Sequence, residues 1–327
     1  MSAGPSVTVI IPARNEMRRW PSVLRSLQAQ TLQPDQVVVA DGSSCDGSRA
    51  WLDRIATTDP SFVVVDNPAR IVPCALNTAL AHATGDVVAR MDTHADYSPD
   101  YLRRVVDVLV SRPDVAGVGG AMRTAGTGNW GAAIAAVLRR PIGLGGARHR
   151  VAHTGGPVVH VFSGCYRREA LLGAGGWDER LQANEDFEAD VRIAKAGATI
   201  WLEPTATTTW YVRRDPAALA QQMWRYGFYK ALTLNLHPGS LQLRQLAPPA
   251  LVTALLIGPL VSPHATAVMA GVYLVAAAGS GALAARRDGA SGLRGAVVVP
   301  IVHLSWGAGL LAGLVRFTRP GRRRHGR

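Results

Sequence analysis

The chain has 327 residues, with 35 Lys and Arg against 23 Asp and Glu, so its formal net charge is +12 at pH 7. This length allows two domains, or one domain with an appendage. A basic balance suits nucleic acid, an anionic membrane surface or phosphorylated substrates, and the uneven spread of apolar residues favours the membrane. The three cysteines fit neither a zinc site nor a disulfide framework, and no signal-peptide pattern opens the chain. We therefore expect a reduced, cytosolic N-terminal part.

Short β-branched runs alternate with amphipathic stretches through the first half of the chain. The runs predict strands at Val7–Ile11, Gln36–Ala40, Phe62–Val65, Val87–Ala89, Val115–Val118 and Val158–Phe162. Apolar residues at i, i+3, i+4 and i+7 from Trp20 predict a helix, and others are expected over Val72–Ala83 and after Ser98, with Ser98 as N-cap and Pro99 at N1. This alternation indicates an α/β fold with a mainly parallel sheet.

Polar residues stand just past the ends of three predicted strands. These are Arg14, Asp41 and Asp92, and ligands on parallel sheets bind beyond the carboxyl ends of the strands. The chain contains no G-x-G-x-x-G after its first strand, no P-loop and no G-x-S-x-G. A dinucleotide-binding dehydrogenase, a P-loop NTPase and the usual serine hydrolase of this architecture are therefore disfavoured.

The stretch GDVVARMDTHAD, residues 85–96, ends the fourth predicted strand in a cluster of polar ligands. On an extended segment Asp92, His94 and Asp96 would point the same way, because alternate side chains share a face. Carboxylates with an imidazole suit a divalent cation such as Mg²⁺ or Mn²⁺. The alternative is a solvated, Asp-rich turn.

Two later segments carry further charged candidates. Thr124–Gly156 is rich in Gly and Arg, including Arg139, Arg140, Arg148 and Arg150, and either closes over an anionic ligand or forms a flexible crossover. Glu185 and Asp186 open a predicted helix, where acidic side chains also simply complement the helix dipole.

The C-terminal part carries three uncharged segments. Ala265–Ala285 and Gly295–Val315 are each twenty-one residues long, enough to span a bilayer, whereas Leu246–Val261 has sixteen residues and three prolines and is short, tilted, kinked or re-entrant. Gly309 and Gly313 form a G-x-x-x-G packing signal. Three crossings would place the six arginines of residues 316–327 outside, against the positive-inside rule. We favour an even number of crossings.

Five motifs in order and at consistent spacing carry a family resemblance. They are VTVIIPARNE, QVVVADGSSCDGS, NPARIVPCALNTALAHATGDVVARMDTHADY, GGWDERLQANEDFEADVRIAKAG and QQMWRYGFYKA. With them the chain, from Val7 to about Val315, resembles family-two glycosyltransferases of GT-A fold, within the membrane-attached branch that includes succinoglycan-type exopolysaccharide glucosyltransferases. The resemblance implies a GT-A catalytic domain over residues 1–240 and transmembrane or membrane-associated helices with a basic tail over residues 241–327.

The resemblance also implies roles for individual residues. The nucleotide sugar is expected to be bound by Pro12, Arg14, Glu16, Asp41, Asn77 and Asp92, and the metal by Asp92 and His94. Asp186, beside Glu185, is expected to act as the catalytic base. The residues expected to face the acceptor or the membrane interface are Trp177, Asp178, Gln222, Arg225 and Tyr226. Two positions depart from the family pattern. His94 stands where the family's D-x-D has its second Asp, and Tyr226 stands where its Q-x-x-R-W has Trp.

The implied activity is that of an inverting, metal-dependent hexosyltransferase using Mn²⁺ or Mg²⁺. Its donor would be a UDP-sugar, UDP-glucose in particular, and its acceptor a lipid-linked saccharide. It would be a multi-pass protein of the cytoplasmic membrane with its catalytic domain in the cytosol. The alternatives are a polyprenyl-phosphate sugar transferase and a catalytically silent membrane partner that binds nucleotide sugar. A nucleic-acid binder is disfavoured, because no such motif is present.

Overall fold

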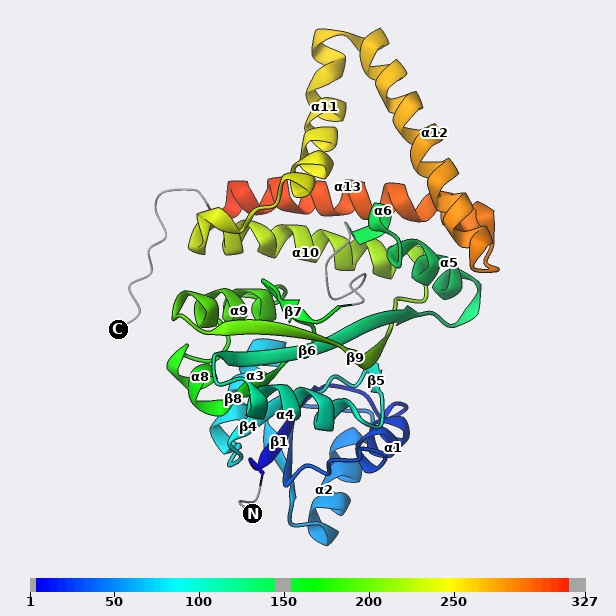
Figure 1. Cartoon of the computed structure of the whole chain (residues 1–327). Coiled ribbons are helices and arrows are strands. Elements are labelled where there is room, and N and C mark those ends of the chain that lie inside the picture. Colours follow the sequence, from blue (N-terminus) through cyan, green and yellow to red (C-terminus); the bar gives the residue numbers. More distant parts are fainter. Residues whose placement is uncertain (1–3, 145–153, 318–327) are drawn as a thin grey trace. The chain divides into compact units, whose positions relative to one another are not determined.

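The computed structural model describes residues 4–144 and 154–317, which form two compact units (Figure 1). Of the described residues, the first unit comprises 4–123 and 154–210, and the second comprises 124–144 and 211–317. The second unit thus includes an inner segment of the chain as well as its C-terminal part. The predicted division of the chain near residue 240 into catalytic and membrane domains stays a prediction. Arg148, Arg150 and the basic tail from residue 318 lie outside the described residues.

Nine strands of the described chain make one mixed sheet in the order β3-β2-β1-β4-β8-β6-β9-β5, with β7 beside β9. The first four strands pair in parallel, as predicted, whereas β8 is antiparallel to both β4 and β6, and β9 is antiparallel to β5 and β7. The strands are β1 (Val7–Ala13), β2 (Gln36–Asp41), β3 (Phe62–Asp66), β4 (Val87–Arg90), β5 (Ala95–Tyr97), β6 (Val115–Ala125), β7 (Gly156–Pro157), β8 (Cys165–Arg167) and β9 (Thr199–Tyr211).

Both faces of the parallel strands are buried, which explains their continuous apolar runs. In β1, Val9 and Ile11 point into one core and Ile10 into the other. Helices α1, α2 and α4 supply buried residues to the first core, and α3, α8 and α9 to the second. Their bounds are α1 (Trp20–Gln28), α2 (Ser48–Thr58), α3 (Val72–His82), α4 (Tyr101–Ser111), α8 (Arg168–Gly173) and α9 (Glu185–Lys195).

Two local predictions in this unit are wrong. Helix α4 begins at Tyr101 with Asp100 as its N-cap, because Ser98 instead begins a turn in which the Tyr101 amide bonds to the Ser98 carbonyl. Val158–Phe162 is not a strand in the described structure. The Val158 amide still bonds to Ile200 of β9, but the segment then leaves the sheet, and the Val161 amide bonds to the Asp190 carboxylate instead of a neighbouring strand.

The second unit is helical. Three of its helices are long and apolar enough to cross a membrane, at Leu243–Val261, Pro263–Arg287 and Gly292–Phe317. The segment predicted as a loop over residues 124–156 forms two helices in its described part, α5 and α6. The bounds are α5 (Gly128–Leu138), α6 (Pro141–Leu144), α10 (Pro216–Leu236), α11 (Ala247–Val261), α12 (Pro263–Arg287) and α13 (Gly292–Phe317), with 3₁₀ turns η1 (Pro238–Ser240) and η2 (Leu243–Leu246).

Glycines let the backbones of α10 and α13 touch. A Cβ on Gly309 would lie 2.2 Å from the Trp224 carbonyl oxygen, and one on Gly313 would lie 2.3 Å from the Phe228 carbonyl oxygen. Helix α13 therefore runs along α10, while α11 and α12 project from this pair as a hairpin (Figure 1). The G-x-x-x-G signal is thus confirmed as a packing motif between helices.

Candidate active site

The parallel strands bring the predicted site residues to one edge of the sheet. Ala13, the last residue of β1, is paired with Asp41, the last residue of β2, and β4 runs parallel to β1 on its other side. Arg14 follows β1 directly, and Asp92 lies two residues after Arg90, the last residue of β4. The expectation that these three residues share the carboxyl edge of the sheet is confirmed.

The side chains of Asp92, His94 and Asp96 do not converge, contrary to the expectation of an extended segment. Thr93 and His94 form a turn, closed by a bond from the Ala95 amide to the Asp92 carbonyl. His94 therefore points to Glu16, with 2.8 Å between Nε2 and Oε1, and Asp96 forms an ion pair with Arg19. Only Asp92 faces the interior of the site.

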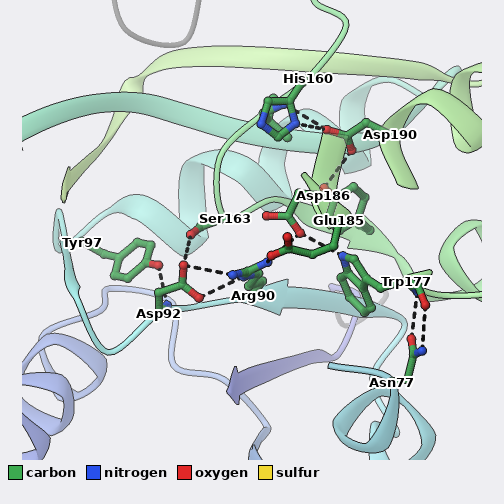
Figure 2. Close-up of polar contacts among 12 residues, drawn as sticks. Asn77, Arg90, Asp92, Tyr97, His160, Ser163, Trp177, Glu185, Asp186 and Asp190 are labelled. Carbon is green, nitrogen blue, oxygen red and sulfur yellow. Dashed lines mark hydrogen bonds and ion pairs between the residues drawn. The ribbon is translucent and has the colours of Figure 1, made fainter. Parts of the chain in front are cut away.

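Arg90 is the centre of that interior (Figure 2). Its Nε lies 2.9 Å from Oδ1 of Asp92, and its Nη1 lies 3.0 Å from Oε1 of Glu185 and 2.7 Å from Oδ1 of Asp186. One guanidinium, 7% exposed, thus contacts three carboxylates. Burial raises the pKa of Glu185 above its ordinary value, and the neighbouring Asp186 adds to this while Arg90 opposes it.

Asp186 is oriented by two donors on one oxygen. Its Oδ1 accepts a hydrogen bond from Arg90 and another from the Trp177 indole, with 2.9 Å from Nε1. Within the described residues no partner contacts Oδ2. The carboxylate is therefore fixed by one oxygen and offers the other for chemistry.

The loop that carries Trp177 is held by Asn77. The Asn77 amide nitrogen bonds to the Trp177 carbonyl at 2.8 Å and to Glu179, and its oxygen accepts from the Trp177 amide. Gly176 has a positive φ of 67°, and a Cβ there would lie 2.5 Å from the Asn77 oxygen. Glycine is required at this position by both its conformation and its space.

Two predicted contacts look different in this arrangement. Trp177, expected at the acceptor, is only 2% exposed, and its indole supports Asp186 instead. Asn77, expected at the donor, uses the hydrogen-bonding groups of its side chain to hold the Trp177 loop.

The carboxyl of Asp178, another predicted acceptor residue, is partly buried. Burial by itself would raise the pKa of Asp178, but the hydrogen bonds from Arg180 outweigh burial and lower this pKa.

The loops after β1 and β2 brace each other beside the predicted nucleotide residues. The Asn15 amide bonds to Ser44 Oγ, the Cys45 amide bonds to Asn15 Oδ1, and the Glu16 amide bonds to Ser48 Oγ. Asp41 is 2% exposed and accepts from the Ser44 amide through Oδ2, while its Oδ1 has no partner in the described structure. A buried carboxylate oxygen without a partner needs an explanation, and a ligand provides one.

The buried carboxylate of Asp190 is not among the site residues that the sequence predicted. Asp190 is fully buried and accepts from Tyr166 at 2.8 Å and from the Val161 amide at 3.0 Å, and its Oδ2 lies 2.7 Å from His160 Nδ1. Burial raises the pKa of Asp190 despite the contact with His160. Its spacing of four residues from Asp186 places both on one face of α9, the one local signal that points to it.

The residues present fit a divalent cation that shares its ligands with a phosphorylated substrate. The described residues contain no group of three His, Cys, Asp or Glu side chains placed to hold a metal by themselves. Cations such as Mg²⁺ are nevertheless bound through one or two carboxylates plus substrate phosphates. The negative charge of the three carboxylates around Arg90 exceeds the single positive charge of its guanidinium. This excess negative charge favours the binding of a further cation near Asp92.

Gln222, Arg225 and Tyr226 lie on α10 in the second unit. Gln222 Nε2 donates to the Tyr226 hydroxyl at 3.1 Å, and the Gln222 oxygen is buried without a hydrogen-bond partner among the described residues. Arg225 is exposed. The predicted place of these residues beside the acceptor stays a prediction.

Comparison with known proteins adds to this geometry. Residues 8–173 match the family described as Glycosyl transferase family 2. The chain is 34% identical over 322 residues to the succinoglycan biosynthesis protein ExoA of Rhizobium meliloti (strain 1021), covering 96% of each chain. The solved mannosyltransferase PcManGT from Pyrobaculum calidifontis, in complex with GDP-Man and Mn²⁺, superposes with a TM-score of 0.62 at 20% identity, covering 93% of this chain and 88% of that one. A structure of GalNAc-T7 with UDP, GalNAc and Mn²⁺ gives a TM-score of 0.50 at 15% identity, covering 74% and 52%.

Proposed function

The chain belongs to glycosyltransferase family 2 and has the GT-A fold, and from that premise we propose that it is an inverting hexosyltransferase of polysaccharide or glycolipid synthesis. Its donor is a UDP-sugar, with UDP-glucose as the first candidate, and its acceptor is a lipid-linked saccharide. Similarity over nearly the full chain to a succinoglycan biosynthesis protein supports the pathway class. The membrane-type helices support a lipid-linked acceptor.

One observation carries the proposal. Arg90 joins Asp92, at the end of β4, to Glu185 and Asp186, at the start of α9, within hydrogen-bonding distance. Asp92, expected at the donor diphosphate, and Asp186, expected at the acceptor hydroxyl, thus both bond to the buried guanidinium of Arg90. A transferase needs these two functions side by side, because the acceptor must attack the carbon that the diphosphate leaves.

The chemistry assigned to the site is a single displacement. The acceptor oxygen forms a bond to the anomeric carbon from the face opposite the diphosphate, and the bond from that carbon to the diphosphate oxygen breaks with its electron pair. Asp186 Oδ2 takes the hydroxyl proton as the attack proceeds, since a neutral alcohol is a weak nucleophile. An α-linked donor therefore gives a β-linked product.

Other residues of the chain prepare this step. Trp177 and Arg90 hold Asp186 in one orientation through its other oxygen. The uridine part of the donor is bound at the ends of β1 and β2 and in the loops that follow them, by Pro12, Arg14, Glu16 and Asp41. Asp92, with His94 as second candidate, would hold Mn²⁺ or Mg²⁺, which when bound offsets the negative charge of the diphosphate leaving group.

We assign the protein to the cytoplasmic membrane, with an even number of membrane crossings. The first unit, which carries the candidate active site and is called the catalytic unit below, lies in the cytosol. Only 11% of the residues in the apolar window of Leu243–Val261 and 17% of those in the window of α12 are buried in the protein. In α13 the buried share is 39%, largely against α10. The exposed side chains of the hairpin, such as Leu260 and Val275, require a hydrocarbon environment. We therefore place the α11–α12 hairpin in the bilayer and α13 along its cytosolic surface.

This topology is tested by cysteine labelling in a cysteine-free background. Ala290→Cys, in the turn between α12 and α13, should react with an impermeant maleimide in inside-out vesicles and stay unreactive in right-side-out ones. A reporter fused after Arg327 should also lie on the cytosolic side. Labelling of Ala290→Cys from outside would contradict the hairpin assignment.

The activity is tested with a panel of UDP-, GDP- and dTDP-sugars, with Mn²⁺ or Mg²⁺ and a membrane-lipid extract. Mass spectrometry should detect one hexose added to a lipid-linked saccharide from a UDP-sugar, with a β-linkage by NMR. Consumption of GDP-sugars alone would overturn the donor assignment. Consumption of no nucleotide sugar would overturn the activity and leave the chain as a silent binding partner.

A further inference from the structure

The second unit contains a cavity of about 740 Å³ at the base of the membrane hairpin. Its walls come from η2, α11, α12, α13 and α6, and most of them are apolar. Leu251 lies on α11, Ala276 and Ala277 on α12, and Val302 on α13. A volume in this range, with a mostly apolar lining and a few polar groups, is typical of a site for an organic ligand.

Two polar side chains in the wall are satisfied by the protein itself. His303 Nε2 lies 3.0 Å from the Ile142 carbonyl oxygen, so this nitrogen carries the proton and donates. Nδ1 is then the acceptor of the neutral ring, and the Tyr273 hydroxyl donates to it at 3.2 Å. The His303 ring and the Tyr273 hydroxyl therefore need no hydrogen bond from water in the cavity. Replacing that water by a hydrocarbon chain costs little desolvation free energy.

The rim of the cavity carries a cation. Arg244, in η2, lines the cavity and is exposed, and no carboxylate forms an ion pair with it in the described part of the chain. The two arginines between α5 and α6 differ, because Arg139 and Arg140 are both paired with Asp288. A guanidinium without a partner at the mouth of an apolar cavity matches a ligand with an anionic head and a hydrocarbon chain.

The setting of the cavity points to the same class of ligand. The helices that enclose it carry exposed apolar side chains on their outer surfaces, including Leu256 and Val272. These surfaces require lipid around them, so the cavity lies beside hydrocarbon and a membrane lipid reaches it without crossing water.

We propose that this cavity binds the chain segment next to the head group of a polyprenyl phosphate or diphosphate lipid, with Arg244 contacting the phosphate. The choice of a prenyl lipid, in preference to a two-chain phospholipid, rests on the proposed function, in which the acceptor is lipid-linked. The presence of a lipid site rests on the cavity and Arg244 alone. The enzyme thereby recognises the carrier of its acceptor at a place distinct from the sugar-transfer site.

The proposal is tested by photo-crosslinking of the full chain in nanodiscs. The probe is a polyprenyl monophosphate with a diazirine in its first isoprene units, and the labelled peptides are identified by mass spectrometry. We expect labels on α11, α12 and α13 around Leu251, Ala277 and Val302. Unlabelled polyprenyl phosphate should remove them, whereas dioleoyl phosphatidylglycerol and inorganic pyrophosphate at equal concentration should not.

Variants with matched controls sharpen the result. Ala276→Trp fills the cavity and should reduce labelling at least tenfold, whereas Val275→Trp, on an exposed position of the same helix outside the cavity lining, should leave it unchanged. Arg244→Gln should weaken competition by polyprenyl phosphate about tenfold, and Arg287→Gln should not. Equal labelling in Ala276→Trp and in the parent protein would overturn the proposal, as would competition by phosphatidylglycerol as strong as that by polyprenyl phosphate.

The labelling experiment does not depend on sugar transfer, so the two proposals fail separately. Nucleotide-sugar turnover together with labels spread evenly over the hairpin would overturn the cavity assignment and leave the transferase activity standing. Labelling of the cavity without turnover of any nucleotide sugar would overturn the transferase activity and leave the cavity assignment standing. Basal hydrolysis of the donor by the control variant Val275→Trp should match that of the parent, because Val275 lies outside both the cavity lining and the first unit.

Discussion

Arg90 and Asp186 are 96 residues apart in the sequence, yet Nη1 of the first lies 2.7 Å from Oδ1 of the second. The contact joins the end of β4 to the first turn of α9. It makes the candidate base part of a buried ionic cluster, and the consequences for activity and stability can be measured residue by residue.

Asp186→Asn should lower sugar transfer by about 10²- to 10⁴-fold, because the amide cannot take the acceptor proton. Donor binding, followed by isothermal titration with the nucleotide sugar, should change little. Glu169→Gln, an exposed carboxylate on α8, is the control and should keep full activity. An acceptor phosphate is already ionised and needs no base, so near-normal transfer by Asp186→Asn would favour the polyprenyl-phosphate sugar transferase.

Trp177→Phe should lower kcat roughly tenfold and leave the KM of the donor nearly unchanged. The substitution keeps the buried ring but removes the hydrogen bond to Asp186 Oδ1, and a bond to a charged group contributes about 1.5–3 kcal/mol. Trp51→Phe, at a tryptophan stacked on Trp20, is the matched control. An increase in KM with unchanged kcat would instead indicate that Trp177 contacts substrate.

Arg90→Met should destabilise the catalytic unit by about 3–5 kcal/mol, since it leaves three carboxylates without their shared cation. Thermal unfolding in detergent measures the change. Arg49→Met removes two ion pairs with the exposed Asp53 and Asp66 and should cost at most about 1 kcal/mol. Similar losses for the two variants would show that the Arg90 cluster is no tighter than a surface pair.

Chelation with EDTA should abolish transfer, and added Mn²⁺ should restore it. Asp92→Asn should raise the Mn²⁺ concentration for half-maximal activity more than tenfold, because it removes the candidate carboxylate ligand. His94→Ala should raise it less, since His94 is half exposed and lies against Glu16. A larger effect at His94 than at Asp92 would reverse the order of these two ligands, and activity unaffected by EDTA would remove the metal from the proposal.

Gly309→Ala should lower the melting temperature of the protein in detergent by several degrees. The added Cβ would lie 2.2 Å from the Trp224 carbonyl oxygen, so α10 and α13 must move apart. Gly271→Ala, on α12, meets open space and should leave the melting temperature unchanged or raise it slightly. Equal melting temperatures for the two variants would contradict the close helix contact.

The sequence by itself determined the parallel strands, the first helix and the apolar C-terminal helices. The β-branched runs at Val7, Gln36 and Phe62 predict β1, β2 and β3 because both faces of a buried parallel strand are apolar, and the spacing from Trp20 predicts α1. Long uncharged segments likewise reveal the apolar helices of the second unit. The family motifs add the order of the site residues along the chain.

Only the tertiary structure decided which polar groups meet. Arg90 bonds to Asp186 and His160 contacts Asp190 because β4 lies beside β8 and α9 packs on the same sheet, and no periodic pattern records such distant pairs. The turn at Thr93 and His94 separates two side chains that an extended segment would have aligned. Periodicity reports which face of an element is apolar, whereas the partner of a buried charge depends on how elements far apart in sequence are packed.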